Sequence, residues 1–169
     1  QNYTQILAQY GVKAEEVDHV LLTHLHFDHA CNADRYPNAR FVVSKPEREY
    51  ANSAGHDLFV EEPAVRLIRE SGRLRQVEDG EEIVPGITAM FTPGHTPGSV
   101  CLYHEAEKVL FSGDTLFRAG FGRTDLAGGS MHQLLSSLRT LLALPRDIKV
   151  YPGHGESTTI DEECRRYRT

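Results

Sequence analysis

The sequence has few cysteines, no long apolar run and no concentration of positive charge. Its three cysteines are an odd number at irregular positions, so they do not form a disulfide framework. No apolar run approaches the roughly 20 residues of a membrane-spanning helix. Lysine and arginine number 18 against 24 acidic residues, a net charge of −6, and never form a run longer than a pair. These absences predict a cytoplasmic protein that binds neither membranes nor nucleic acids.

Length and hydrophobic pattern predict a single α/β domain over residues 1–169. With 169 residues, 40% of them hydrophobic, the chain can bury a core without disulfides. Leucines at helical spacing make residues 131–144 the clearest helix. Further helices are expected at 4–10, 46–51, 60–70 and 160–167. Strands are expected at 17–22, 40–43, 74–77, 87–91, 100–103, 109–111 and 148–151.

Seven histidine and aspartate side chains follow the predicted strands. Three histidines and an aspartate occupy six consecutive positions, two more histidines stand in glycine-rich loops, and one aspartate follows an apolar run. They are His24, His26, Asp28, His29, His95, Asp114 and His154. Each of the seven, Asp28 and His29 included, is expected in a glycine, proline or polar turn outside the predicted elements. Turns at one end of neighbouring strands can bring such side chains into one cleft. Four other histidines lack this context and are interpreted as ordinary surface or hydrogen-bonded residues.

Imidazole and carboxylate are the usual ligands of zinc and related divalent metals, and seven are more than one ion needs. His24 and His26 are two residues apart and point to one side of an extended segment, so they are expected to bind one ion together with His95. The second ion would take Asp28, His29 and His154, with Asp114 bridging both ions. Such a pair activates water at neutral pH. The sequence predicts two divalent ions, zinc first, with iron or manganese as alternatives.

These motifs resemble the metallo-β-lactamase superfamily over about residues 18–160. The resemblance rests on the segment His24-Leu25-His26-Phe27-Asp28-His29, followed in this order by His95, Asp114 and His154. The resemblance implies an αββα sandwich with the metals at one edge. It also implies the same division of the seven ligands between two sites.

Within the superfamily, two segments are similar to short bacterial type II glyoxalases: Gly94-His95-Thr96-Pro97-Gly98-Ser99, and the run from Ser112 to Arg123. This resemblance implies hydrolysis of a small acyl thioester, such as S-lactoylglutathione, by a metal-bound hydroxide. Asp28 and Asp114 are the predicted catalytic residues. Arg118 or Arg123 is predicted to orient a carboxylate of the substrate. Alternatively, Arg123 pairs with Asp125 and only shapes the turn.

The sequence departs from the superfamily at both ends. Only 23 residues precede His24, so the sandwich is expected to lack its first strands. We expect either a piece of a longer protein or a second chain that covers the exposed sheet, as in a homo-oligomer. Only 15 residues follow His154, too few for the helical domain with which longer glyoxalase II enzymes hold glutathione. Glutathione specificity is therefore not implied.

Three alternative functions fit the same ligands. The histidine block and Tyr36-Pro37-Asn38-Ala39 are also similar to acyl-homoserine-lactone lactonases. A mononuclear iron persulfide dioxygenase would use only His24, His95 and Asp114. An inactive metal-binding module is the third alternative, although all seven ligand positions are filled.

Overall fold

The computed structural model of the protein describes residues 3–167. Its α-helices are α1 (Tyr3–Gln9), α2 (Phe27–Ala30), α3 (Lys45–Ala51), α4 (Glu62–Glu70), α5 (Met131–Leu142) and α6 (Ile160–Arg166). Its strands are β1 (His19–Leu21), β2 (Arg40–Ser44), β3 (Leu74–Val77), β4 (Glu82–Val84), β5 (Ile87–Phe91), β6 (Val100–His104), β7 (Val109–Gly113), β8 (Leu116–Phe117), β9 (Gly120–Phe121), β10 (Lys149–Pro152) and β11 (Thr158–Thr159). Two short 3₁₀ helices span Ala14–Glu16 and Ala33–Arg35.

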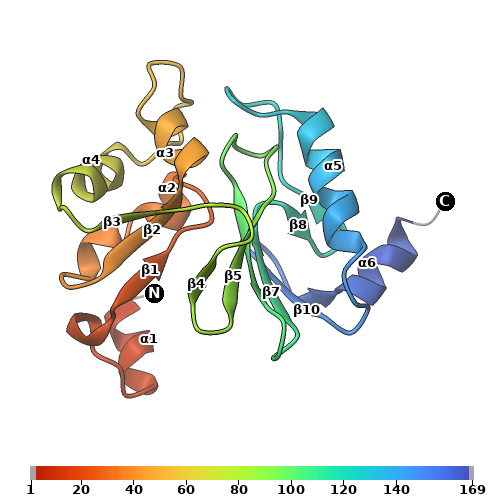
Figure 1. Ribbon diagram of the computed structural model, residues 1–169, viewed down its shortest axis with the longest axis horizontal. Helices are drawn as coiled ribbons and strands as arrows, with labels where there is room; N and C mark the ends of the chain where they lie inside the picture. The colour runs from red at the N-terminus through yellow and green to blue at the C-terminus, as the bar shows by residue number, and fades with distance from the viewer. Residues whose placement is uncertain (1–2, 168–169) are drawn as a thin grey trace.

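The strands form two main sheets that face each other. The first is parallel and has the order β1-β2-β3. The second has the order β11-β10-β7-β6-β5-β4, and β10 and β7 are its parallel neighbours. Figure 1 shows α3 and α4 on the outer side of the first sheet and α5 and α6 on the outer side of the second. This is the predicted αββα sandwich; a short hairpin of β8 and β9 accompanies it.

Alternating side chains of single strands supply the different layers of the core. Along β2, Phe41 and Val43 pack in a cluster with the outer helices, whereas Val42 packs in the cluster between the sheets. Along β6, Val100 and Leu102 join that same inner cluster, while Cys101 packs toward α5 and α6. A strand with both faces buried has a continuous run of apolar residues. The sequence therefore predicts β2 and β6.

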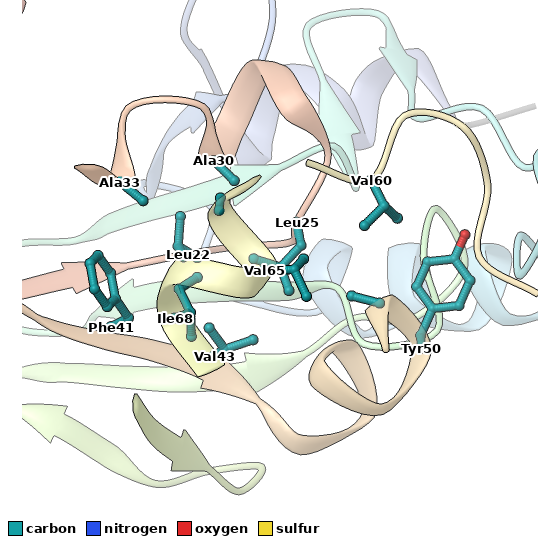
Figure 2. Packing of buried hydrophobic residues seen from close by; sticks show 12 residues of the cluster. Leu22, Leu25, Ala30, Ala33, Phe41, Val43, Tyr50, Val60, Val65 and Ile68 are labelled. Carbon is teal, nitrogen blue, oxygen red and sulfur yellow. The ribbon is translucent and has the colours of Figure 1, made fainter. Parts of the chain in front are cut away.

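The outer helices bury their apolar faces on the sheets. Figure 2 shows Val65 and Ile68 of α4 packed with Phe41 and Val43 of the first sheet. On the other side, the Ser130 side chain caps α5 by accepting a hydrogen bond from the Gln133 N–H. The helix then buries three leucines at helical spacing, Leu134, Leu138 and Leu141. Packing of these faces fixes the sheets that carry the predicted ligands.

Local details differ from the sequence-based expectations. Asp28 and His29 were expected in a turn, but they belong to the one-turn helix α2, for which His26 is the N-cap residue. Four strands of only two or three residues (β4, β8, β9 and β11) were not predicted. The leucine-rich helix ends at Leu142 rather than at Leu144. Such short strands depend on their partners rather than on a local apolar pattern.

Three further expectations concern the surroundings of the chain. All three cysteines are free thiols, as expected. No helix among residues 3–167 has the length and apolar character to cross a bilayer, and a cytoplasmic location stays a prediction. Strand β1 lies at one edge of the first sheet, and its coverage by a second chain also stays a prediction.

Candidate metal centre

All seven predicted ligands meet at one edge of the sandwich. The segment after β1 carries His24 and His26 and continues into α2 with Asp28 and His29. His95 lies between β5 and β6, Asp114 directly follows β7, and His154 follows β10. Their donor atoms fall into three overlapping groups, each within 4.8 Å: His24, His26 and His95; His24, His29 and Asp114; Asp28, His29 and His154. Segments far apart in the chain thus converge as the sequence predicts.

Three buried imidazoles form the first group. His24, His26 and His95 are 0%, 4% and 3% exposed. Their ring centroids lie 4.8 to 4.9 Å apart, and each pair of rings is nearly perpendicular. The ring nitrogens His26 Nδ1 and His95 Nε2 are 3.0 Å apart. Perpendicular rings that turn nitrogens toward a common point suit tetrahedral coordination of one ion.

The second group lies nearer the surface, and Asp114 separates it from the first. His154 Nε2 is 3.0 Å from Asp28 Oδ2, and His29 Nε2 is 3.6 Å from the same oxygen. Asp114 Oδ1 lies 3.2 Å from His29 Nε2. Asp114 Oδ2 lies 3.4 Å from His154 Nε2 and 3.6 Å from His95 Nε2. One carboxylate therefore faces both groups of ligands.

Hydrogen bonds on the outer side of the first group orient its rings. The Nε2–H of His26 donates to Asp57 Oδ2 at 3.0 Å, and the Nδ1–H of His95 donates to the Arg123 carbonyl at 2.8 Å. Because carboxylate and carbonyl oxygens only accept, the proton of each neutral ring lies on its outer nitrogen. The lone pairs of His26 Nδ1 and His95 Nε2 then point inward.

Several polar atoms of the centre are buried without a partner, which tests whether a metal would fit. His24 Nε2, His29 Nε2 and Asp114 Oδ1 have almost no accessible surface and make no hydrogen bond. The last two lie 3.2 Å apart without the alignment that a hydrogen bond requires. Buried polar atoms nearly always have partners. Each of these three atoms can donate an electron pair to a divalent metal ion. The residues of the centre therefore fit a metal ion.

The electrostatics favour the ligand forms of His24, His95 and Asp114, whereas they favour the protonated form of His29. Burial and the neighbouring imidazoles hold the pKa of His24 well below its usual range, and burial also lowers the pKa of His95. Burial raises the pKa of Asp114, but the nearby histidines, His29 foremost, outweigh this effect and lower it overall. At His29, burial is outweighed by the Asp114 and Asp28 carboxylates, so the pKa is raised. Neutral imidazoles and an ionised carboxylate are the forms that bind metal.

Two residues that the sequence analysis missed support the ligand segments. Asp57 accepts hydrogen bonds from His26 and from the Tyr50 hydroxyl at 2.7 Å. The fully buried Glu47 accepts from the Leu25 N–H at 2.9 Å, the Thr96 hydroxyl at 2.6 Å and the Gly98 N–H at 3.1 Å. Glu47 thus joins the segment of His24 and His26 to the loop of His95. A polar residue within a predicted helix was the only sequence signal for it.

Glycines beside the ligands allow close packing of the ligand loops. A Cβ atom on Gly153 would lie 2.2 Å from Asp114 Oδ1 and 2.7 Å from His29 Cε1. Gly94 has φ +140°, and a Cβ atom there would lie 2.4 Å from the backbone of Leu134 in α5. The same loop is held by a hydrogen bond from the Ser130 N–H to the Gly94 carbonyl at 2.8 Å. Helix α5 therefore fixes the position of His95.

A cavity of about 420 Å³ opens onto the ligands. It is lined by His26, Phe27, Asp28, Phe59, His95, Asp114, Phe117, Phe121, Arg123, Leu126 and His154. The two predicted substrate-binding arginines differ in position. Arg123 lines the cavity and is paired with Asp125 through two hydrogen bonds of 2.6 and 2.8 Å. Arg118 pairs with Glu156 and lies outside the lining. Their contact with substrate stays a prediction.

Comparison with known proteins identifies the class. A sequence profile described as the metallo-beta-lactamase superfamily matches residues 2–154. The chain therefore belongs to the metallo-beta-lactamase superfamily, whose members bind divalent metals, and this membership supports an enzyme of the metallo-hydrolase type. The structural neighbours share the fold, which confirms the predicted fold class.

Three similar proteins illustrate this membership. The probable metallo-hydrolase YqgX of Bacillus subtilis is 36% identical, over 83% of this chain and 70% of that protein. A hydroxyacylglutathione hydrolase of Francisella tularensis subsp. holarctica is 35% identical, over 89% of this chain but only 55% of that enzyme. The crystal structure of TTHA1623 in a di-iron-bound form superimposes with a TM-score of 0.77 at 30% identity, covering 98% of this chain and 84% of that one.

Proposed function

We propose that this chain is a dinuclear metal-dependent hydrolase of the glyoxalase II type that cleaves small acyl thioesters. One observation carries the proposal: two groups of three donors share the carboxylate of Asp114 between them. The similarity to a hydroxyacylglutathione hydrolase supports thioester substrates, and the di-iron-bound neighbour supports two ions. All seven donors are present, which argues against an inactive module.

The chain's donors divide between two ions. His24, His26 and His95 would hold the first ion, Asp28, His29 and His154 the second, and Asp114 both. Zinc is the first candidate, with iron or manganese as alternatives. Ions bound there would lower the pKa of water and polarise a carbonyl group.

The side chains of the centre also position the reactants. Asp28 lines the cavity, and its carboxylate can accept a hydrogen bond from a water that faces the substrate carbonyl. The water oxygen forms a bond to the carbonyl carbon and the carbon–sulfur bond breaks. The thiolate leaves with the electron pair, the acyl group leaves as a carboxylate, and the two protons of the water pass to solvent. A thiolate needs little protonation to depart, so this step does not depend on a general acid.

A substrate panel tests the proposal. Purified protein would be assayed with S-lactoylglutathione, an acyl-homoserine lactone and a glutathione persulfide, with metal content measured in the same samples. We expect thioester turnover that falls at least about 100-fold in Asp114→Asn, because the shared ligand is lost. The matched control is Asp147→Asn, which removes only an exposed ion pair with Lys108. Turnover of the lactone or the persulfide alone would replace the thioester proposal by one of the alternative functions.

A further inference from the structure

Apolar side chains form most of the cavity wall above the proposed metal centre. These side chains are Phe27, Phe59, Phe117, Phe121 and Leu126. Three of the phenylalanines keep substantial contact with solvent: Phe27 is 47%, Phe59 40% and Phe121 38% exposed. Exposed apolar side chains that gather around a cavity are typical of a ligand-binding surface. The wall therefore favours an apolar group next to the reacting atoms.

Hydrogen bonds fix this wall relative to the ligand segment. The rings of Phe27 and Phe59 stack with centroids 6.2 Å apart and an angle of 26°. The Phe27 N–H donates to the Phe59 carbonyl at 2.8 Å, and the Phe59 N–H donates to Asp57 Oδ1 at 2.6 Å. Because Asp57 also holds His26, one carboxylate positions both a metal ligand and the aromatic wall. The wall thus belongs to a preorganised site.

Apart from the two proposed ions, the side chains that line the cavity offer little charge complementarity to an anionic thiol. Among the described residues, Arg123 is the one lysine or arginine that lines the cavity, and its guanidinium is paired with the Asp125 carboxylate. Asp28 and Asp114 also line the cavity, but as ligands they would be compensated by the proposed ions. A thiol that carries free carboxylates, as glutathione does, would find no uncompensated guanidinium or ammonium group there.

We propose, on the basis of the thioester hydrolase function proposed above, that the cavity selects thioesters with an apolar acyl group on an uncharged thiol. The acyl chain would lie against Phe27, Phe59 and Leu126. A hydroxylated, short acyl group on glutathione would leave this wall in contact with water.

The test measures kcat/KM for N-acetylcysteamine thioesters, whose thiol is uncharged, with acetyl, butanoyl, hexanoyl and octanoyl groups. S-hexanoylglutathione and S-lactoylglutathione complete the series. We expect kcat/KM to rise about two- to fourfold per methylene until the wall is covered, as transfer of a methylene from water predicts. The uncharged hexanoyl thioester should be the better substrate of the two hexanoyl compounds. Hexanoate should also inhibit competitively at lower concentration than lactate.

Two variants connect the preference to the named residues. Phe59→Ala should lower kcat/KM for the hexanoyl thioester about tenfold more than it lowers kcat/KM for the acetyl thioester. Phe111→Ala is the matched control, because Phe111 is similarly exposed at 43% but stacks on Tyr151 away from the cavity lining. Asp125→Asn removes the carboxylate that pairs with Arg123. This variant should raise kcat/KM for S-hexanoylglutathione relative to kcat/KM for the uncharged hexanoyl thioester.

The outcomes separate the two proposals. No turnover of any thioester by the metal-loaded protein overturns both the proposed function and this inference. Thioester turnover without dependence on chain length, or a preference for S-lactoylglutathione, overturns the inference and leaves the function intact. The chain-length series on the wild-type protein decides the matter even if Phe59→Ala fails to fold.

Discussion

The substitution Glu47→Gln should remove a pH dependence of stability from the metal-free protein. The Glu47 side chain is buried between two ligand segments, and burial raises its pKa from 4.5 to about 7. Between these values the folded state holds a proton on Glu47, whereas the unfolded chain does not. Because the native state binds more protons, the free energy of unfolding falls as the pH rises through this window.

The magnitude follows from the width of the window. Each pH unit between the two pKa values corresponds to about 1.4 kcal/mol, so Glu47 alone should lower the free energy of unfolding by about 3 kcal/mol from pH 4.5 to about pH 7. This contribution is fully present below pH 4.5 and is lost above about pH 7. It is a large part of the roughly 5–15 kcal/mol that stabilises a typical domain.

Urea unfolding of metal-free wild-type protein and Glu47→Gln, at several pH values from about 5 to 8, measures this contribution. The stability difference between the two proteins isolates Glu47, because all other titrating groups are common to both. Glu70→Gln is the control, since Glu70 is exposed beside Arg66, which lowers its pKa. A difference that stays constant across this range would refute the reasoning. It would mean that the three hydrogen bonds to Glu47 outweigh its burial.

Two further substitutions test the support of the ligands. Asp57→Ala should weaken metal binding about 10- to 100-fold, because His26 loses the acceptor that orients it; competition with a chromophoric chelator measures this, and unchanged affinity would contradict it. Gly94→Ala should lower the free energy of unfolding by more than about 2 kcal/mol, because its Cβ would meet the Leu134 backbone. Gly72→Ala, with a positive φ but no neighbour within 4 Å, should cost only about 1 kcal/mol in the same denaturation experiment.

The strands and ligands that the sequence predicts are those with local signals. The runs of β3 and β5 coincide with the expected ranges, because glycine, proline and other turn residues bound each run on both sides. The segment from His24 to His29 places four donors within six residues. His95, Asp114 and His154 each follow such a strand. Their convergence could be predicted because the ends of neighbouring strands meet at one edge of a sandwich.

The supporting residues could not be predicted, since their partners are distant in the chain. Asp57 is 31 residues from His26, and Glu47 is 22 residues from Leu25. Neither forms a local motif, and each becomes informative only when packing brings the segments together. Helix α2 was missed for a related reason: one turn of helix is too short to show a period, so Asp28 and His29 were expected in a turn.

The number of metal ions bound per chain tests the two-ion centre most directly. Metal-free protein would be titrated with Zn²⁺, dialysed and analysed by inductively coupled plasma mass spectrometry against protein concentration, in parallel with His154→Ala. We predict two equivalents for the wild-type chain and one for the variant, because His154 belongs to the second group of donors alone. One equivalent or fewer in the wild-type protein, or an unchanged count in the variant, would contradict a centre of two ions that share Asp114.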